Sequence, residues 1–258
     1  MNERRRLWEL KQSAESGVLE LYIYGDVEAY TIDYESWSIR RSENSAEHFR
    51  EELAKYPNAS EIRIFINSYG GSVFEGTAIY NQLKRHPARK IVHVDGFACS
   101  IASVIAMAGD EIVMPRNTMM LIHNMWSEAV GNAAELRKAA DDLDIINAAG
   151  RQAYLAKAGD KLTEDRLMEL MDAESWLTAE QCVELGLADR IADEDANMSG
   201  TAAIMQQANA SLKQRLQYQK SLAAQLRELT AAPAGGGEQK ESQQDGAPAK
   251  NKVLSLFE

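Results

Sequence analysis

Short stretches in which apolar and polar positions alternate recur between residues 18 and 123, and most of them end at a glycine or a polar turn. Such alternation, together with many β-branched residues, is typical of β-strands. The strands that this pattern predicts are 19–24, 62–66, 90–95, 111–114 and 119–123.

Between and after these stretches, apolar residues recur every three or four positions, as they do along one face of an α-helix. The pattern predicts helices over 48–56, 74–85, 100–108, 131–157, 164–171 and 179–185. In the second of these helices, the face expected to be buried comprises Phe74, Ala78, Ile79 and Leu83. In the long helix it comprises Leu136, Ala140, Leu143, Ile146 and Ala153. The alternation of strands and helices predicts an α/β domain whose helices cover its sheet.

The character of the chain changes after residue 192. Residues 202–229 have the spacing of one amphipathic helix, whereas 231–252 are small and polar without apolar periodicity, so we expect that segment to be disordered. The last six residues, VLSLFE, are either a frayed end or a docking or cleavable tail. We therefore divide the chain into an N-terminal segment 1–17, a main domain 18–192, a linker and helix 193–230, and a tail 231–258.

Composition excludes several classes of protein. The chain has 258 residues, a formal net charge of −11 and 45% hydrophobic residues, which suits one domain of ordinary core size with appendages. The acidic balance disfavours nucleic acid as a partner. No apolar run reaches the roughly 18 residues that a membrane span needs, and the start lacks the apolar stretch of a signal peptide, so we expect a cytoplasmic protein.

Metal and cofactor chemistry is not expected. Two cysteines exclude a disulfide scaffold and a four-cysteine zinc module. The histidines have no paired spacing, and the chain has neither a phosphate-loop lysine pattern nor a GxGxxG opening a helix after a strand.

The candidate nucleophile is Ser100, where a strand broken at Gly96 gives way to an apolar helix. Amides at a helix start can stabilise a developing oxyanion. The amide of Ile101 would be one donor, and the double glycine before the helix 74–85 offers Gly71 as the second. The alternative interpretation is that Ser100 caps the helix. A weaker alternative is that Cys99 is the nucleophile.

A serine nucleophile needs a base, and the chain has four histidines. His48 lies on a charged helix, His86 precedes a proline and His93 is mid-strand, whereas His123 ends a strand before a loop. His123 is therefore the best candidate, although a structural role stays open. The orienting acid would be Asp172 or Glu174, beside Trp176, unless both are surface acids.

Four blocks, in this order, resemble the ClpP family of serine peptidases. They are residues 66–73 (INSYGGSV), 95–102 (DGFACSIA), 120–124 (MLIHN) and 176–189, which holds WLTAEQ and LGLAD. The chain looks closest to the ClpP-related proteases that tailed phages and prophages use in head maturation. The resemblance covers roughly residues 18–192 and implies the ClpP/crotonase-like superhelix of repeated β-β-α units.

The resemblance also implies roles for single residues. Ser100 matches the nucleophile, His123 the base, and Gly71 and Ile101 the oxyanion donors. Glu174 occupies the column of the family's aspartate, with Asp172 two residues earlier as the alternative acid. Departures from the family pattern are Tyr69 in place of proline, and Cys99 and Ile101 in place of alanine and methionine.

The function implied is a cofactor-independent serine endopeptidase, independent of ATP or only loosely coupled to it, that cleaves capsid or scaffold proteins inside a bacterial host or a phage prohead. The long helix 131–157 matches the handle through which family members assemble into rings, so a homo-oligomeric ring is implied. Two alternatives stay open. One is a proteolytic subunit working with an ATP-dependent unfoldase, although residues 1–17 do not match the family's unfoldase-binding loops. The other is an inactive assembly scaffold.

Overall fold

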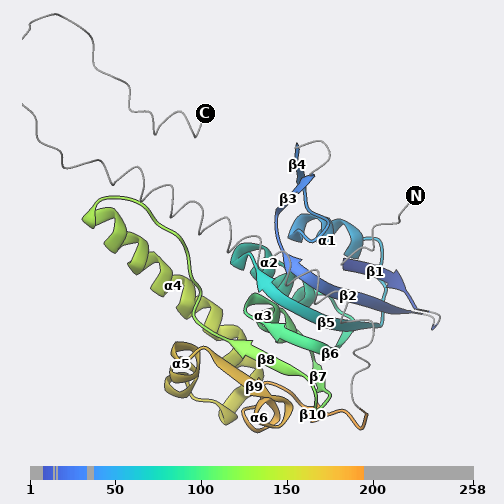
Figure 1. Cartoon of the computed structure of the whole chain (residues 1–258). Coiled ribbons are helices and arrows are strands. Elements are labelled where there is room, and N and C mark those ends of the chain that lie inside the picture. Colours follow the sequence, from blue (N-terminus) through green and yellow to red (C-terminus); the bar gives the residue numbers. More distant parts are fainter. Residues whose placement is uncertain (1–7, 14, 16, 34–37, 195–258) are drawn as a thin grey trace, which may run out of the picture. The chain divides into compact units, whose positions relative to one another are not determined.

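The computed structural model describes residues 8–13, 15, 17–33 and 38–194 (Figure 1). The chain divides into two units, Met1–Ser211 and Leu212–Glu258, and all described residues belong to the first. The helix expected over 202–229 and the tail 231–258 lie outside the described residues. Within the described part, no helix is both long and apolar enough to cross a membrane.

A mixed sheet organises the fold, and within the described residues it has eight strands (Figure 1). Its main path runs β1-β2-β5-β6-β7-β10, while β8 pairs with β6 and β9. The pairs inside the main path from β2 onward, and the β6–β8 pair, are parallel, whereas β1–β2 and β8–β9 are antiparallel. The strands are β1 Trp8–Gln12, β2 Val18–Val27, β5 Glu61–Gly71, β6 Arg89–Cys99, β7 Glu111–Met114, β8 Met119–Ile122, β9 Ser175–Thr178 and β10 Arg190–Ile191. A separate hairpin joins β3 Tyr30–Asp33 and β4 Ser38–Arg41.

Strands β5 and β6 are longer than the pattern predicts, and this extension builds the candidate site. Both were expected to stop at about Ile66 and Asp95, but their ladder continues after a register shift to the pair Ser68–Ala98. The segment around Gly70 is therefore held by sheet hydrogen bonds rather than being a free loop.

The described residues also form six α-helices, and most of these begin at a side-chain cap. Ser45, Ser72, Asn132, Thr163 and Thr178 each accept a hydrogen bond from an amide of the first turn. The helices are α1 Ala46–Leu53, α2 Val73–Arg85, α3 Ile101–Ala106, α4 Ala133–Ala158, α5 Glu164–Asp172 and α6 Ala179–Glu184. The short α3 is buried along its whole length, as expected from its lack of charge.

Two predicted helix faces are wrong in part. Phe74 is 76% exposed, because α2 instead packs the face with Gly76, Ile79 and Leu83 inward. Gly76 sets this rotation, since a Cβ there would lie 2.2 Å from Cγ1 of Ile101. On α4, Leu136 is exposed, and the buried residues are Asn147, Ala153, Tyr154 and Ala158 in its second half.

Five short strands among the described residues escaped the sequence pattern: β1, the paired β3 and β4, β9 and β10. They are two to five residues long, and their stability comes from pairing with a neighbour rather than from an apolar face of their own. Strand β9 matters most here, because it pairs with β8 and carries Trp176 beside the candidate site.

Candidate active site

Ser100 is the single residue between the end of β6 and the start of α3. Its φ of 55° and ψ of −130° are values that residues with a side chain rarely adopt. The side chain makes no capping hydrogen bond, so Ser100 does not serve as a capping side chain. Its backbone amide donates to the carbonyl of Leu121 in β8, 2.9 Å away. The half-buried hydroxyl is thus presented on a constrained turn.

The double glycine lies directly against this turn. A Cβ added to Gly70, whose φ is +95°, would lie 2.7 Å from Cβ of Ser100 and 3.2 Å from the amide nitrogen of Ile101. Gly71, with φ of +143°, would place a Cβ 2.2 Å from the carbonyl oxygen of Val27. Only glycine fits both positions. The glycine in contact with Ser100 is Gly70, a residue that the sequence pattern did not single out.

His123 directly follows β8, whose Leu121 pairs with Cys99 of β6. This pairing brings His123 and Ser100 to the same edge of the sheet. Nδ1 of His123 lies 2.6 Å from the carbonyl oxygen of Asn124. Because a carbonyl can only accept, Nδ1 carries the proton and Nε2 of the neutral ring has a free lone pair. The described contacts include no hydrogen bond between the side chains of His123 and Ser100.

The two candidate acids occupy different positions. Asp172, the last residue of α5, accepts a hydrogen bond of 2.7 Å from Nδ2 of Asn124. Glu174 is exposed and has φ of 47°, and its side chain makes no hydrogen bond or ion pair among the described residues. Neither carboxylate reaches His123 directly in this structure. The sequence pattern missed Asn124, whose side-chain amide donates to Asp172 and whose carbonyl accepts from Nδ1 of His123.

The remaining chemical candidates have structural roles. Cys99 is 1% exposed, and burial raises the pKa of its thiol to about 12, so it stays protonated and inaccessible. Nδ1 of His86 accepts from the amide of Ala88, and the His93 ring stacks on Phe65. The described residues contain no cluster of three or more possible metal ligands.

Aromatic rings follow one another beside the site. Tyr69, at the position where proline was expected, lies 6.0 Å from Phe97 between ring centroids, and Phe97 lies 5.9 Å from Trp176 edge to face. The ring of Tyr69 therefore ties the end of β5 to β6 and β9, which supplies packing that a proline would not.

Comparison with known proteins places the chain in a family. Residues 42–195 match the Clp protease family. The chain is 26% identical over 149 residues to the ATP-dependent Clp protease proteolytic subunit 3 of Rhodococcus jostii, a match that covers 57% of this chain and 73% of that relative. It is 27% identical over 154 residues to proteolytic subunit 1 of Streptomyces avermitilis, covering 58% and 70%. With the proteolytic subunit of Chlorella vulgaris it shares 31% over 144 residues, covering 53% and 70%.

The match spans more than half of the chain and includes the turn at Ser100, the strand end at His123 and both candidate acids. The mixed sheet with its covering helices is the architecture that the resemblance implied. The chain belongs to the Clp protease family and is a serine-type endopeptidase.

Proposed function

We propose that Ser100 is the nucleophile of this endopeptidase and His123 its general base. The observation that carries the proposal is the turn at Ser100, where the hydroxyl is uncommitted, the backbone is in a rare conformation and Gly70 packs against it. In this scheme Ser100 Oγ attacks the scissile carbonyl while its proton passes to Nε2 of His123. The imidazolium then protonates the leaving amine, and water hydrolyses the acyl-enzyme with His123 again as base.

The oxyanion that forms on the scissile carbonyl is held by the amides of Ile101 and Gly71. Both belong to backbone next to Ser100, and oxyanion donors of this kind need no rearrangement during the reaction. The close approach of Gly70 to Ser100 and to the Ile101 amide supports this assignment, because it brings the double glycine beside the attacking oxygen.

The third residue orients His123. Glu174 occupies the family column, while Asp172 acts through Asn124, whose carbonyl already binds Nδ1. Glu174→Gln and Asp172→Asn separate the two, since each removes the charge with little change in shape. The variant whose cleavage rate falls more, at an unchanged thermal midpoint, identifies the acid.

The nucleophile is tested by labelling with a fluorophosphonate probe and by cleavage of casein. We expect Ser100→Ala to abolish both, with Ser72→Ala still labelled as the serine control. Labelling of Ser100→Ala at the wild-type rate would overturn the assignment.

The finer biological role that we propose is cleavage of capsid or scaffold proteins during phage head maturation, within a bacterial host or its proheads. The four ordered blocks 66–73, 95–102, 120–124 and 176–189 support it, because together they resemble the ClpP-related proteases of tailed phages and prophages. Co-expression with the capsid and scaffold proteins of a tailed phage would give specific cleavage products, and Ser100→Ala would give none. Intact capsid and scaffold proteins with the active enzyme would contradict this role.

The second candidate is a proteolytic subunit that works with an ATP-driven unfoldase. The names of the curated relatives favour it, since each is an ATP-dependent Clp protease subunit. Degradation of a folded, tagged substrate only when unfoldase and ATP are added would support this candidate. Cleavage of unfolded casein at the same rate with and without unfoldase and ATP would favour the first candidate. Both candidates act on protein substrates as a homo-oligomeric ring, which sedimentation would measure.

A further inference from the structure

One face of α4 is turned toward both candidate catalytic residues. Asn147, Gly150 and Tyr154 are spaced by three and four positions, so they share a helix face. A Cβ on Gly150 would lie 2.2 Å from Cε of Met125, two residues after His123. The helix therefore packs closely against the segment that follows the base.

Tyr154 reaches the nucleophile through Ser103. The Tyr154 hydroxyl lies 2.6 Å from Oγ of Ser103, and both side chains are buried. Oγ of Ser103 in turn lies 2.5 Å from the carbonyl oxygen of Ser100 and 3.5 Å from that of Leu121. Ser103 has one hydroxyl proton, and the carbonyls can only accept it. Tyr154 must therefore donate to Ser103, which donates to Ser100.

Burial keeps this direction fixed. Desolvation raises the pKa of Tyr154 well above that of a free phenol, so its hydroxyl keeps its proton at neutral pH. Both backbone polar groups of Ser100 then have partners: the amide bonds to Leu121, and the carbonyl accepts from Ser103. A residue in a rare backbone conformation persists only when its surroundings hold it there.

Asn147 acts in the same way on the segment after His123. Asn147 is 7% exposed, and its Oδ1 accepts a hydrogen bond of 2.7 Å from the amide of Met125. Fixing Met125 fixes the neighbouring peptide of Asn124, whose carbonyl accepts from Nδ1 of His123. The orientation of the imidazole thus depends on a side chain of α4.

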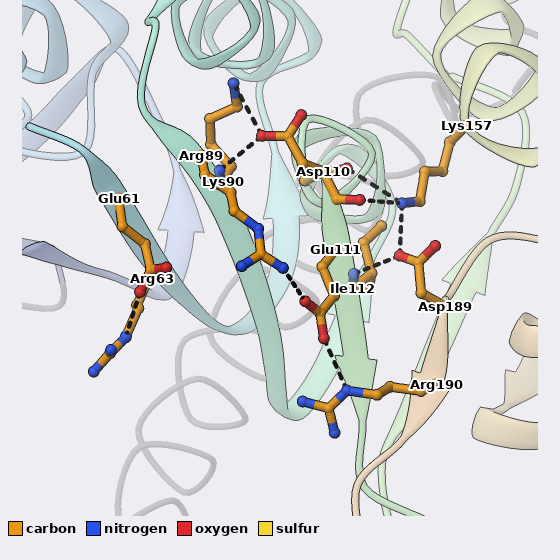
Figure 2. A network of polar contacts seen from close by, with 11 residues as sticks. Glu61, Arg63, Arg89, Lys90, Asp110, Glu111, Ile112, Lys157, Asp189 and Arg190 are labelled. Carbon is orange, nitrogen blue, oxygen red and sulfur yellow. Dashed lines mark hydrogen bonds and ion pairs between the residues drawn. The ribbon is translucent and has the colours of Figure 1, made fainter.

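The C-terminal end of α4 is anchored to the sheet (Figure 2). Nζ of Lys157 donates to Asp189 at 2.6 Å and to the carbonyls of Gly109 and Asp110. Oδ2 of Asp189 also accepts from the amide of Ile112 in β7 at 2.6 Å. The buried half of α4 is therefore held in place while its Asn147 and Tyr154 side chains contact the site.

We propose that Ser103, Tyr154 and Asn147 are positioning residues. Ser103 and Tyr154 fix the backbone of Ser100, and Asn147 fixes the peptide that orients the ring of His123. The proposal rests on the assignment of Ser100 and His123 as nucleophile and base. It predicts that removing these polar groups slows chemistry at Ser100 by more than the accompanying loss of stability explains.

The test compares Ser103→Ala, Tyr154→Phe, their double variant and Asn147→Ala in the full chain. For each we measure the second-order rate of labelling of Ser100 by a fluorophosphonate, the casein cleavage rate and the thermal midpoint. Displacement of a catalytic group by about 1 Å can cost about 10²-fold in rate, so we expect labelling to fall at least tenfold for Ser103→Ala and Asn147→Ala. The labelling rate of Tyr154→Phe should fall less, because this variant loses one oxygen and keeps the ring.

The matched control is Tyr24→Phe, which also removes a tyrosine hydroxyl bonded to a polar side chain, Asp95, at 2.5 Å. Tyr24→Phe should lower the thermal midpoint about as much as Tyr154→Phe does, and its Ser100 should be labelled at the wild-type rate. Because Tyr154 acts only through Ser103, the double variant should label no more slowly than Ser103→Ala.

Two failures are distinguishable. If Ser103→Ala and Asn147→Ala label like Tyr24→Phe, while Ser100→Ala is not labelled, the positioning role is wrong and the nucleophile assignment stands. If Ser100→Ala is itself labelled at the wild-type rate, the assignment of the nucleophile fails and the positioning role fails with it.

Discussion

Replacing Gly70 by alanine perturbs the contact between the double glycine and the turn at Ser100. The new Cβ would lie 2.7 Å from Cβ of Ser100 and 2.8 Å from the carbonyl oxygen of Cys99. Both distances are shorter than real contacts, and the backbone at Cys99 cannot yield easily inside a sheet. Overpacking of this kind costs about 1–3 kcal/mol, and the left-handed φ of +95° adds about 1–2 kcal/mol for a residue with a Cβ. We expect a total loss of about 2–5 kcal/mol.

Gly159→Ala supplies the matched control. Gly159 also has a positive φ, +57°, but a Cβ there would meet nothing within 4 Å. It therefore carries the backbone penalty of about 1–2 kcal/mol alone. Urea unfolding of both variants, followed by circular dichroism, measures the difference, which we assign to the contact with Ser100. Labelling by a fluorophosphonate at a temperature where both variants are folded measures the effect on the site.

We expect Gly70→Ala to lose more stability than Gly159→Ala and to label much more slowly. If the two variants are equally stable and Ser100 is labelled at the wild-type rate in both, the inference that Gly70 packs closely on Ser100 is wrong.

Three further predictions concern groups outside the reaction. Burial lowers the pKa of His93 below its ordinary 6.5, so the unfolded chain binds this proton more tightly than the folded chain does. Acidification through pH 6.5 therefore destabilises the fold. Between pH 7 and 5.5, the thermal midpoint of His93→Phe, which keeps an aromatic ring against Phe65, should fall by less than that of the wild type. Lys157→Met breaks its bonds to Asp189 and two carbonyls and should cost about 1–3 kcal/mol in urea unfolding, whereas exposed Lys138→Met should cost under about 0.5 kcal/mol. The buried Cys99, with a pKa of about 12, should resist iodoacetamide at pH 8 until denaturant is added; rapid alkylation of the native protein would contradict its burial.

Local patterns predicted the central strands and the helices. They also predicted the helix start at Ser100 and the strand end at His123. These features depend on near neighbours in the chain, since a buried strand must alternate and a turn into a buried helix needs small residues. The resemblance of four ordered blocks then connected them into one site.

The contacts that join distant segments could not be predicted in this way. Asn124 and Asp172 are 48 positions apart, and Ser103 and Tyr154 are 51 apart. No period or spacing marks such pairs, because their partners meet only once the sheet has formed. The exposed Phe74 has a related cause: its helix could present either of two apolar faces, and the contact of Gly76 with Ile101 selects one.

The rare backbone conformation of Ser100 lowers the stability of the fold, and a residue that relieves this strain would lower the activity. Glycine would relieve the strain at φ 55° and should stabilise the chain by about 1–2 kcal/mol, but it would remove the hydroxyl that we propose as the nucleophile. Ser100→Ala, in contrast, keeps the Cβ and its strain, so it reproduces the active turn without the hydroxyl. Selection for stability alone would therefore favour glycine at this position, and directed evolution toward thermostability should be run with an activity screen.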